Sequence, residues 1–239
     1  MTGKFREVSP RLAKAVKILA VLQDFVGPQL TDATCLDIGC ASGVIPQSLA
    51  QYVKGVVGVD IDQTAVQIAH AQNIEKNVSY VIANGEGLPL PAESFDVILC
   101  AQVYEHTISQ QALADEIWRV LRPGGICFFS GPNRLAVIEE HYWLPFLSWL
   151  PRPIADIYMR LFRRGDVYDI RPMFYWQLCN MWRRFKKYDY TIRLIKDPEH
   201  FAIRENMGKM RWVSRLPNAL LKLSIILFPN YNWILIKVE

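Results

Sequence analysis

The stretch that decides the fold is Thr34-Cys35-Leu36-Asp37-Ile38-Gly39-Cys40-Ala41-Ser42-Gly43. Its apolar first half predicts a buried strand, its small residues predict a tight turn, and residues 44–53 have the pattern of a helix. Glycine has no Cβ, so the backbone at Gly39 and Gly43 can approach a ligand closely. The stretch therefore predicts a binding site at a strand end, with Asp37 beside it.

A second apolar strand, residues 56–60, ends in Asp60, seventeen residues after Gly43. In a βαβ nucleotide site, a carboxylate near this position binds the ribose. Asp37 and Asp60 are therefore expected at neighbouring strand ends. Simple strand-end capping is the structural alternative for both.

Strand and helix patterns alternate through the first half of the chain. Five strands are predicted at 34–38, 56–60, 78–83, 95–102 and 126–130, with helices over 44–53, 63–72 and 109–121. Mostly unalternated apolar strands with helical crossovers are typical of a parallel sheet covered on both faces, in an α/β fold. A helix beginning at Ser9-Pro10 and ending at Gly27-Pro28 precedes the first strand, and should pack on the sheet's flank or over its ligand edge.

The pattern changes after Pro132. Helices are predicted near 153–163 and 173–183 and over 208–228 with a break at Pro217, and strands over 188–195 and 233–238. Residues 1–131 hold nine Lys and Arg against thirteen Asp and Glu, whereas residues 132–239 hold eighteen against ten and six of the seven tryptophans. The two halves are expected to face different partners.

Three kinds of site or segment are disfavoured. The five cysteines lack C-x-x-C spacing and are expected to be reduced core thiols, and no carboxylate cluster has metal-binding spacing, so no metal is expected. No secretory leader is expected, because charged residues interrupt the first apolar run. The uncharged run near the C-terminus, Leu223 to Ile236, is too short and broken to cross a bilayer.

The turn does not fit a dinucleotide. Counting from Gly39, Ala41 and Val44 stand where G-x-G-x-x-G requires glycine. Asp37 would also repel a pyrophosphate but attract a cation. An adenosine compound with a positively charged remainder, such as S-adenosylmethionine, satisfies both acidic groups.

Residues 36–43 resemble the first motif of the class I S-adenosylmethionine-dependent methyltransferases. Further segments resemble later family motifs in order: Val59-Asp60-Ile61, Leu88-Pro89-Leu90-Pro91, Ser94-Phe95-Asp96-Val97-Ile98 and Leu121-Arg122-Pro123-Gly124-Gly125. The resemblance spans residues 34–131. It implies a Rossmann-like three-layer sandwich with a mostly parallel seven-stranded sheet, whose last strand is antiparallel. Helical insertions would follow strand five and separate strands six and seven.

The same resemblance implies the cofactor contacts. Asp37 would bind the methionine ammonium and Asp60 the ribose hydroxyls, while Ile61 would pack on the adenine. Asn84 stands where the family usually has Asp at the adenine amino group; an ordinary turn residue is the alternative. The remaining backbone contacts would come from Gly39, Cys40, Ala41, Gly85, Ala101 and Gln102.

Catalysis requires chiefly positioning, since the methyl group moves by in-line displacement. A base is needed only for some acceptors, and Glu105-His106, just past the fourth strand, is the candidate pair, with His106 the better-tuned base. A structural histidine is an equal alternative. His141 and Tyr142 are weaker candidates.

The basic, aromatic second half has two functional interpretations beside a plain solvated face. The apolar run over 216–228 favours a membrane-surface platform with a lipid-linked or amphipathic acceptor; RNA binding through Arg and aromatics is less favoured.

The sequence thus predicts one methyltransferase domain over 1–239, with an N-terminal helix in 1–30, a cofactor-binding half in 31–132 and an acceptor-side half in 133–239. The expected acceptor is a small molecule, a lipid-linked compound or a glycan. An RNA methyltransferase and a non-catalytic S-adenosylmethionine-binding subunit are the alternatives. The expected location is the cytoplasm, with peripheral contact to the inner face of the membrane.

Overall fold

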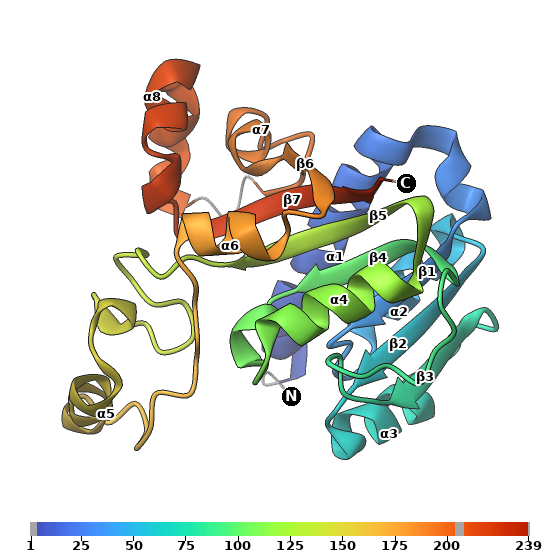
Figure 1. Cartoon of the computed structure of the whole chain (residues 1–239), viewed down its shortest axis with the longest axis horizontal. Helices are drawn as coiled ribbons and strands as arrows, with labels where there is room; N and C mark the ends of the chain where they lie inside the picture. The colour runs from blue at the N-terminus through green and yellow to red at the C-terminus, as the bar shows by residue number, and fades with distance from the viewer. Residues whose placement is uncertain (1–3, 204–207, 239) are drawn as a thin grey trace.

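A twisted seven-stranded sheet forms the centre of the computed structural model, which describes residues 4–203 and 208–238 (Figure 1). The strands are β1 (Thr34–Ile38), β2 (Gly55–Asp60), β3 (Val78–Ile82), β4 (Phe95–Ala101), β5 (Leu121–Pro132), β6 (Phe185–Asp189) and β7 (Asn230–Lys237). Their order is β3-β2-β1-β4-β5-β7-β6. Strands β1 to β5 pair in parallel, and β7 lies antiparallel between β5 and β6. The predicted fold class, including the antiparallel last strand, is confirmed.

Helices cover both faces of the sheet. The α-helices of the described residues are α1 (Lys4–Val26), α2 (Val44–Leu49), α3 (Gln63–Gln72), α4 (Gln110–Val120), α5 (Arg152–Leu161), α6 (Tyr175–Met181), α7 (Thr191–Lys196) and α8 (Asn218–Leu223). Short 3-10 helices are η1 (Gly27–Asp32), η2 (Ala50–Tyr52), η3 (Tyr104–His106), η4 (Leu147–Trp149), η5 (Gly208–Arg215) and η6 (Ile225–Leu227). Figure 1 shows α4 and α6 in front of the sheet and α1 behind it.

Two large apolar cores sit between these layers. One joins α1, α2, α3 and α7 to the sheet, and the other joins α4 and α6 to its opposite face. In the second core Phe129 of β5 lies against the rings of Tyr104, Trp182 and Trp233, with centroids 5.2 to 5.5 Å away. Both cores hold the strands rigidly, so the ends of β1, β2 and β4 are fixed relative to one another.

Strand order reverses at β1, which has β2 on one side and β4 on the other. In open parallel sheets, ligands bind at the carboxyl ends of the strands beside such a reversal. The turn after β1 lies at this point, which is where the sequence predicts the site.

Three predicted elements differ in the structure. Helix α1 begins at Lys4 rather than Ser9, with Pro10 inside it; proline has a helical φ, and its inclusion costs one backbone hydrogen bond. Residues 191–196 are helical, because Asp189 ends β6 by accepting a hydrogen bond from the Thr191 N–H and Thr191 and Leu194 are buried at helical spacing. Residues 208–228, predicted to be helical with a break at Pro217, form three short helices: η5 ends before Pro217, and α8 and η6 follow it.

The segment 133–172 between β5 and α6 contains α5 and folds around its own small core, which includes Leu147, Ala155 and Met159. Its two ends meet. Asn133 forms an isolated parallel bridge with Met173, and the Tyr104 hydroxyl donates to the Pro132 carbonyl and accepts from the Met173 N–H. In Figure 1 the segment extends from the sheet, with α5 at its far side. No helix among the described residues is long and apolar enough to cross a bilayer.

Candidate active site

Asp37 lies inside the protein at the carboxyl end of β1. Its side chain is 2% exposed, and its Oδ2 has no hydrogen-bond partner among the described residues. Burial raises the pKa of Asp37 to about 8, the charge of Lys14 opposes this, and the charge of Asp60 adds to it. A buried carboxylate lacking a partner is costly, so this oxygen is suited to receive a cationic donor from a ligand.

Asp60 holds the turn after β1 at the end of the neighbouring strand. Its Oδ2 accepts from the Ala41 N–H at 2.8 Å and its Oδ1 from the Asp62 N–H at 2.9 Å. The Gly39 and Cys40 N–H groups both donate to the Val59 carbonyl, at 2.8 and 3.0 Å. Asp37 and Asp60 therefore lie at one edge of the sheet, near enough for the charge of one to raise the pKa of the other.

Gly39 makes this turn possible. Its φ is +76°, and a Cβ built there would lie 2.7 Å from the Cγ2 atom of Val103. A side chain would be strained both by the backbone conformation and by the lack of space. Gly39 is itself exposed, so its backbone is accessible where the sequence predicts close approach of a ligand.

The predicted adenine side contains one exposed apolar residue and one turn residue. Ile61 is 70% exposed directly after Asp60. The Asn84 Oδ1 accepts from the Glu86 N–H at 3.0 Å, which is the geometry of the turn alternative, and Gly85 lies over the Ile38 side chain. On the other side of β1, Ala101 ends β4, and Gln102, with φ +63°, donates its N–H to the Ser130 carbonyl.

Glu105 and His106 lie in η3, just past β4. The Glu105 side chain is fully buried, and neither carboxylate oxygen has a hydrogen-bond partner among the described residues. Burial raises the pKa of Glu105 to about 7, although the charges of His141 and Lys14 lower it. The pKa of the more exposed His106 is lowered by partial burial and by His141.

The 133–172 segment brings His141 to this pair. The His141 Nε2 lies 3.7 Å from a Glu105 oxygen, and the His106 and His141 rings meet edge to face with centroids 5.1 Å apart. Glu139, also buried, hydrogen-bonds the His141 Nδ1 at 2.8 Å and thereby raises the pKa of His141. Tyr142 is directed elsewhere, because its hydroxyl donates to Asp169.

Glu105, His106 and His141 form a set that could hold a metal ion, with candidate ligand atoms within 4.8 Å of one another. The linear spacing gave no sign of it, because His141 is distant in sequence. The expectation of a metal-free site stays a prediction.

Lys14 of α1 is a site residue that the sequence analysis missed. Burial lowers its pKa, while the charges of Glu105, Asp37 and Glu140 raise it. Its ammonium is thus placed among the acidic groups. The only signal in the sequence is a helix that must cover either the flank or the ligand edge of the sheet.

The geometry fits S-adenosylmethionine. The unpaired Asp37 oxygen is available for an ammonium group, and Asp60 sits at the adjacent strand end where a ribose would bind. Exposed Ile61 offers an apolar surface for adenine.

Comparison with known proteins agrees with this geometry. A family described as a methyltransferase domain matches residues 36–129. A ubiquinone biosynthesis O-methyltransferase of Mesorhizobium japonicum is 36% identical over 125 residues, 49% of this chain and 49% of the relative. The chain spans about half the length of the curated relatives it matches.

Solved structures share the fold over nearly the whole chain. The YcgJ protein of Bacillus subtilis has a TM-score of 0.59 at 16% identity and covers 95% of this chain and 99% of its own. An S-adenosylmethionine-dependent methyltransferase of Mesorhizobium loti has a TM-score of 0.59 at 14% identity. The match covers 87% of this chain and 93% of that structure's chain. Residues 36–129 of the chain therefore match a methyltransferase domain, and a solved S-adenosylmethionine-dependent methyltransferase shares the fold of the chain.

Proposed function

We propose that the protein transfers a methyl group from S-adenosylmethionine to an oxygen of a small or lipid-linked acceptor. The observation that carries the proposal is the pair of carboxylates, Asp37 and Asp60, at adjacent ends of β1 and β2 beside a glycine turn. The oxygen acceptor is supported by the relatives described as O-methyltransferases.

In this proposal each side of the turn has one task. Asp37 binds the methionine ammonium and Asp60 the ribose hydroxyls. Ile61 and Gly85 lie along the adenine, and the backbone of Ala101 and Gln102 borders the methionine end. S-adenosylmethionine supplies a methyl group already activated on a sulfonium, so the protein chiefly positions the acceptor.

Proton removal from a hydroxyl acceptor falls to the Glu105–His106 region. His106 is the more exposed of the two and has a lowered pKa, so its neutral form is available as a base near pH 7. The nearby His141, oriented by Glu139, belongs to the same cluster. Glu105 favours the positive charge that a histidine gains on accepting a proton.

Isothermal titration with S-adenosylmethionine tests the cofactor assignment. We expect the wild type to bind and Asp60→Ala to lose most of that affinity. Asp62→Asn is the matched control: it removes a charge two residues away but keeps a good helix cap for α3. No binding by the wild type, or full binding by Asp60→Ala, would contradict the assignment. Transfer of a labelled methyl group to acceptors in a lysate separates an enzyme from a non-catalytic binding subunit.

Peripheral contact with an anionic membrane is a second element of the proposal. Leu220, Leu223, Ile226 and Leu227 are exposed on α8 and η6, and Leu223 is 78% exposed. Lys222 lies among them, as expected for a segment at a lipid surface. The protein would then act at the cytoplasmic face of the membrane.

Vesicle flotation tests this contact. We expect recovery with anionic vesicles, and loss of recovery in Leu223→Glu. Ile74→Glu is the control, because Ile74 is similarly exposed beyond α3, on another part of the molecule. Absence of flotation by the wild type would refute membrane contact, and tight salt-sensitive binding to tRNA would favour the RNA alternative.

A further inference from the structure

A cavity of about 310 Å³ lies between the 133–172 segment and the start of α4 and is lined by three arginines. Arg134 follows β5, Arg152 begins α5, and Arg171 precedes α6. No acidic side chain lines the cavity, and the other polar lining groups are neutral: Gln110, Ser148, Tyr168 and Gln177. The size is within the range of small-ligand sites.

The three guanidinium groups are not neutralised by neighbours. Among residues 4–203 and 208–238, none of them is within salt-bridge distance of a carboxylate, whereas Arg119, Arg122 and Arg193 elsewhere each pair with one. Three like charges gathered without counter-charges repel one another. An anion bound between them would remove this cost and accept several charge-assisted hydrogen bonds.

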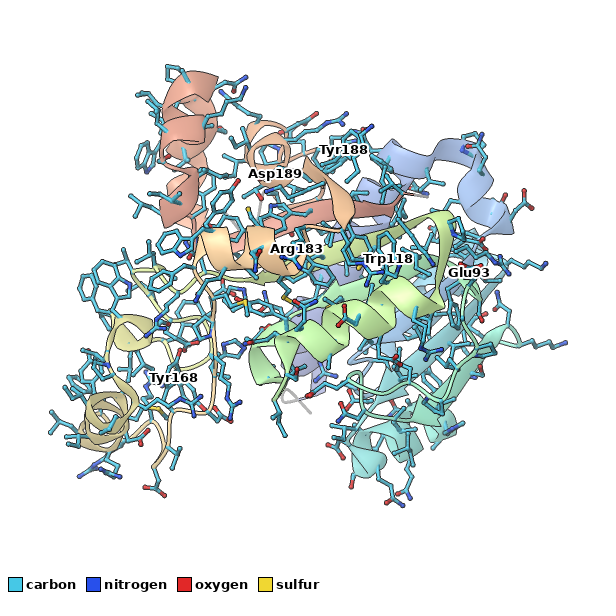
Figure 2. All side chains as sticks on the ribbon, viewed as in Figure 1. Glu93, Trp118, Tyr168, Arg183, Tyr188 and Asp189 are labelled. Carbon is cyan, nitrogen blue, oxygen red and sulfur yellow. The ribbon has the colours of Figure 1, made fainter. Side chains whose placement is uncertain are left out.

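Arg134 and Ser148, which line the cavity, are held in place by contacts that leave the terminal nitrogens of Arg134 free to donate. The Arg134 Nε donates to the Ser148 carbonyl at 3.2 Å, and its guanidinium lies over the Phe174 ring at 5.0 Å. Ser148 is further fixed by its hydroxyl, 3.1 Å from the Tyr168 hydroxyl. Figure 2 labels Tyr168 beside α5. The terminal nitrogens of Arg134 remain available to a ligand, so the Arg134 side of the cavity is preformed.

The cavity adjoins the proposed methyl-transfer site through the backbone. The Arg171 N–H donates to the Glu105 carbonyl at 2.8 Å, and the Gln110 side chain donates to the Arg171 carbonyl at 3.0 Å. Ile108, two residues past His106, lines the cavity itself. An acceptor held by its anionic group in the cavity would therefore extend toward His106.

We propose that this cavity binds a phosphate or diphosphate group of the methyl acceptor. Arg134, Arg152 and Arg171 supply the charge, and Gln110 and Gln177 supply neutral donors. The inference rests on the proposed function, since it names the acceptor class for the same site. Phosphate chemistry is favoured over a carboxylate because three arginines from three separate elements suit an anion with several oxygens on different sides.

The exposed face of α5 suggests how such a group would be presented. Ile154, Ile157 and Leu161 are exposed on the helix that Arg152 begins. An apolar surface next to a phosphate site fits an amphipathic phosphate-bearing molecule. A free phosphorylated compound would use the same arginines without α5, and the experiment distinguishes the two sources.

Isothermal titration with inorganic diphosphate and inorganic phosphate tests the site in the full chain. We expect wild type to bind diphosphate more tightly than phosphate, with affinity falling as salt rises. Arg152→Gln and Arg171→Gln should each weaken diphosphate binding at least tenfold. The matched control is Arg183→Gln; Figure 2 shows Arg183 near α4 and α6, away from Tyr168, and it does not line the cavity.

Unaltered diphosphate affinity in both Arg152→Gln and Arg171→Gln, or no binding by wild type, would overturn the inference. Titration with S-adenosylhomocysteine is run on the same samples, as a check on folding and on the proposed function. If the wild type binds S-adenosylhomocysteine but not diphosphate, the phosphate site alone is refuted. If the wild type does not bind S-adenosylhomocysteine, the methyltransferase proposal is refuted.

Vesicle flotation assigns the source of the phosphate. Vesicles of phosphatidylcholine containing phosphatidic acid are compared with phosphatidylcholine alone. Release of the wild type from the acidic vesicles by free diphosphate, together with poor recovery of Arg152→Gln, supports a lipid phosphate. Diphosphate binding in solution without any effect of diphosphate on flotation supports a free phosphorylated acceptor.

Discussion

Replacing Asp37 with asparagine should flatten the pH dependence of stability in the ligand-free protein. Burial raises the pKa of Asp37 from 3.8 to about 8. Between these values the folded protein keeps the carboxyl protonated, whereas the unfolded chain ionises it. The free energy of unfolding therefore falls as pH rises through this window, and the loss is complete only above pH 8.

The size of the effect follows from the shift. Each pH unit inside the window lowers the stability by about 1.4 kcal/mol. Between pH 5.5 and 7.5, Asp37 alone should account for a loss of about 2.5 kcal/mol. An asparagine side chain is neutral at every pH, so the Asp37→Asn variant lacks this contribution.

Urea unfolding at the two pH values, for both proteins, measures this difference. The pKa shifts of Glu105 and Lys14 act in both proteins, so the comparison between wild type and Asp37→Asn cancels most of their effect. Saturating S-adenosylhomocysteine, which carries the ammonium group, should stabilise the wild type more than the variant at pH 7.5. Equal pH dependence in the two ligand-free proteins would refute the reasoning.

Three further changes test the fold around the site, each by urea unfolding. Gly39→Ala should lower the free energy of unfolding by about 2 kcal/mol, because φ is +76° and the new Cβ meets Val103. Gly87→Ala is the control: its Cβ has open space, so the free energy of unfolding should fall by less than half as much. Equal losses of stability in the two variants would contradict the argument. Phe129→Ala should lose about 3 to 5 kcal/mol, since it empties the centre of the core shared with α4 and α6, and a loss under about 1 kcal/mol would contradict this packing. Tyr104→Phe should lower the free energy of unfolding by about 1 to 3 kcal/mol, because the Met173 N–H and the Pro132 carbonyl lose their hydroxyl partner. An unchanged urea midpoint of unfolding would contradict this expectation.

The first half of the fold, residues 34–132, was predictable because its signals are local. The strand, turn and helix around Asp37 are set by apolar runs and small residues, and Asp60 follows at the end of the next apolar run, β2. Parallel strands then bring these ends to one edge, so a linear pattern determines a spatial cluster.

The fold of residues 133–238 was less predictable, because its elements depend on contacts between segments that are distant in sequence. Alternation over 188–195 fits a strand, but the Asp189 side chain ends β6 and residues 191–196 turn into a helix. The approach of His141 to Glu105 depends on how the 133–172 segment folds around its own core, which no local pattern specifies. The position of Lys14 near Asp37 and Glu105 depends likewise on which side of the sheet α1 packs against.

The meeting of residues 132 and 173 at the Tyr104 hydroxyl also bears on how new substrates are acquired. The chain leaves β5 and returns to α6 at nearly one point, so residues 133–172 form an insertion whose two ends lie side by side. Insertions in the loops of this segment, away from His141 and Arg171, are expected to leave the strand pairing and the turn after β1 in place. Under the proposed function, the acceptor can change through changes in this segment, provided that the Tyr104 hydroxyl and the two backbone groups it holds are retained.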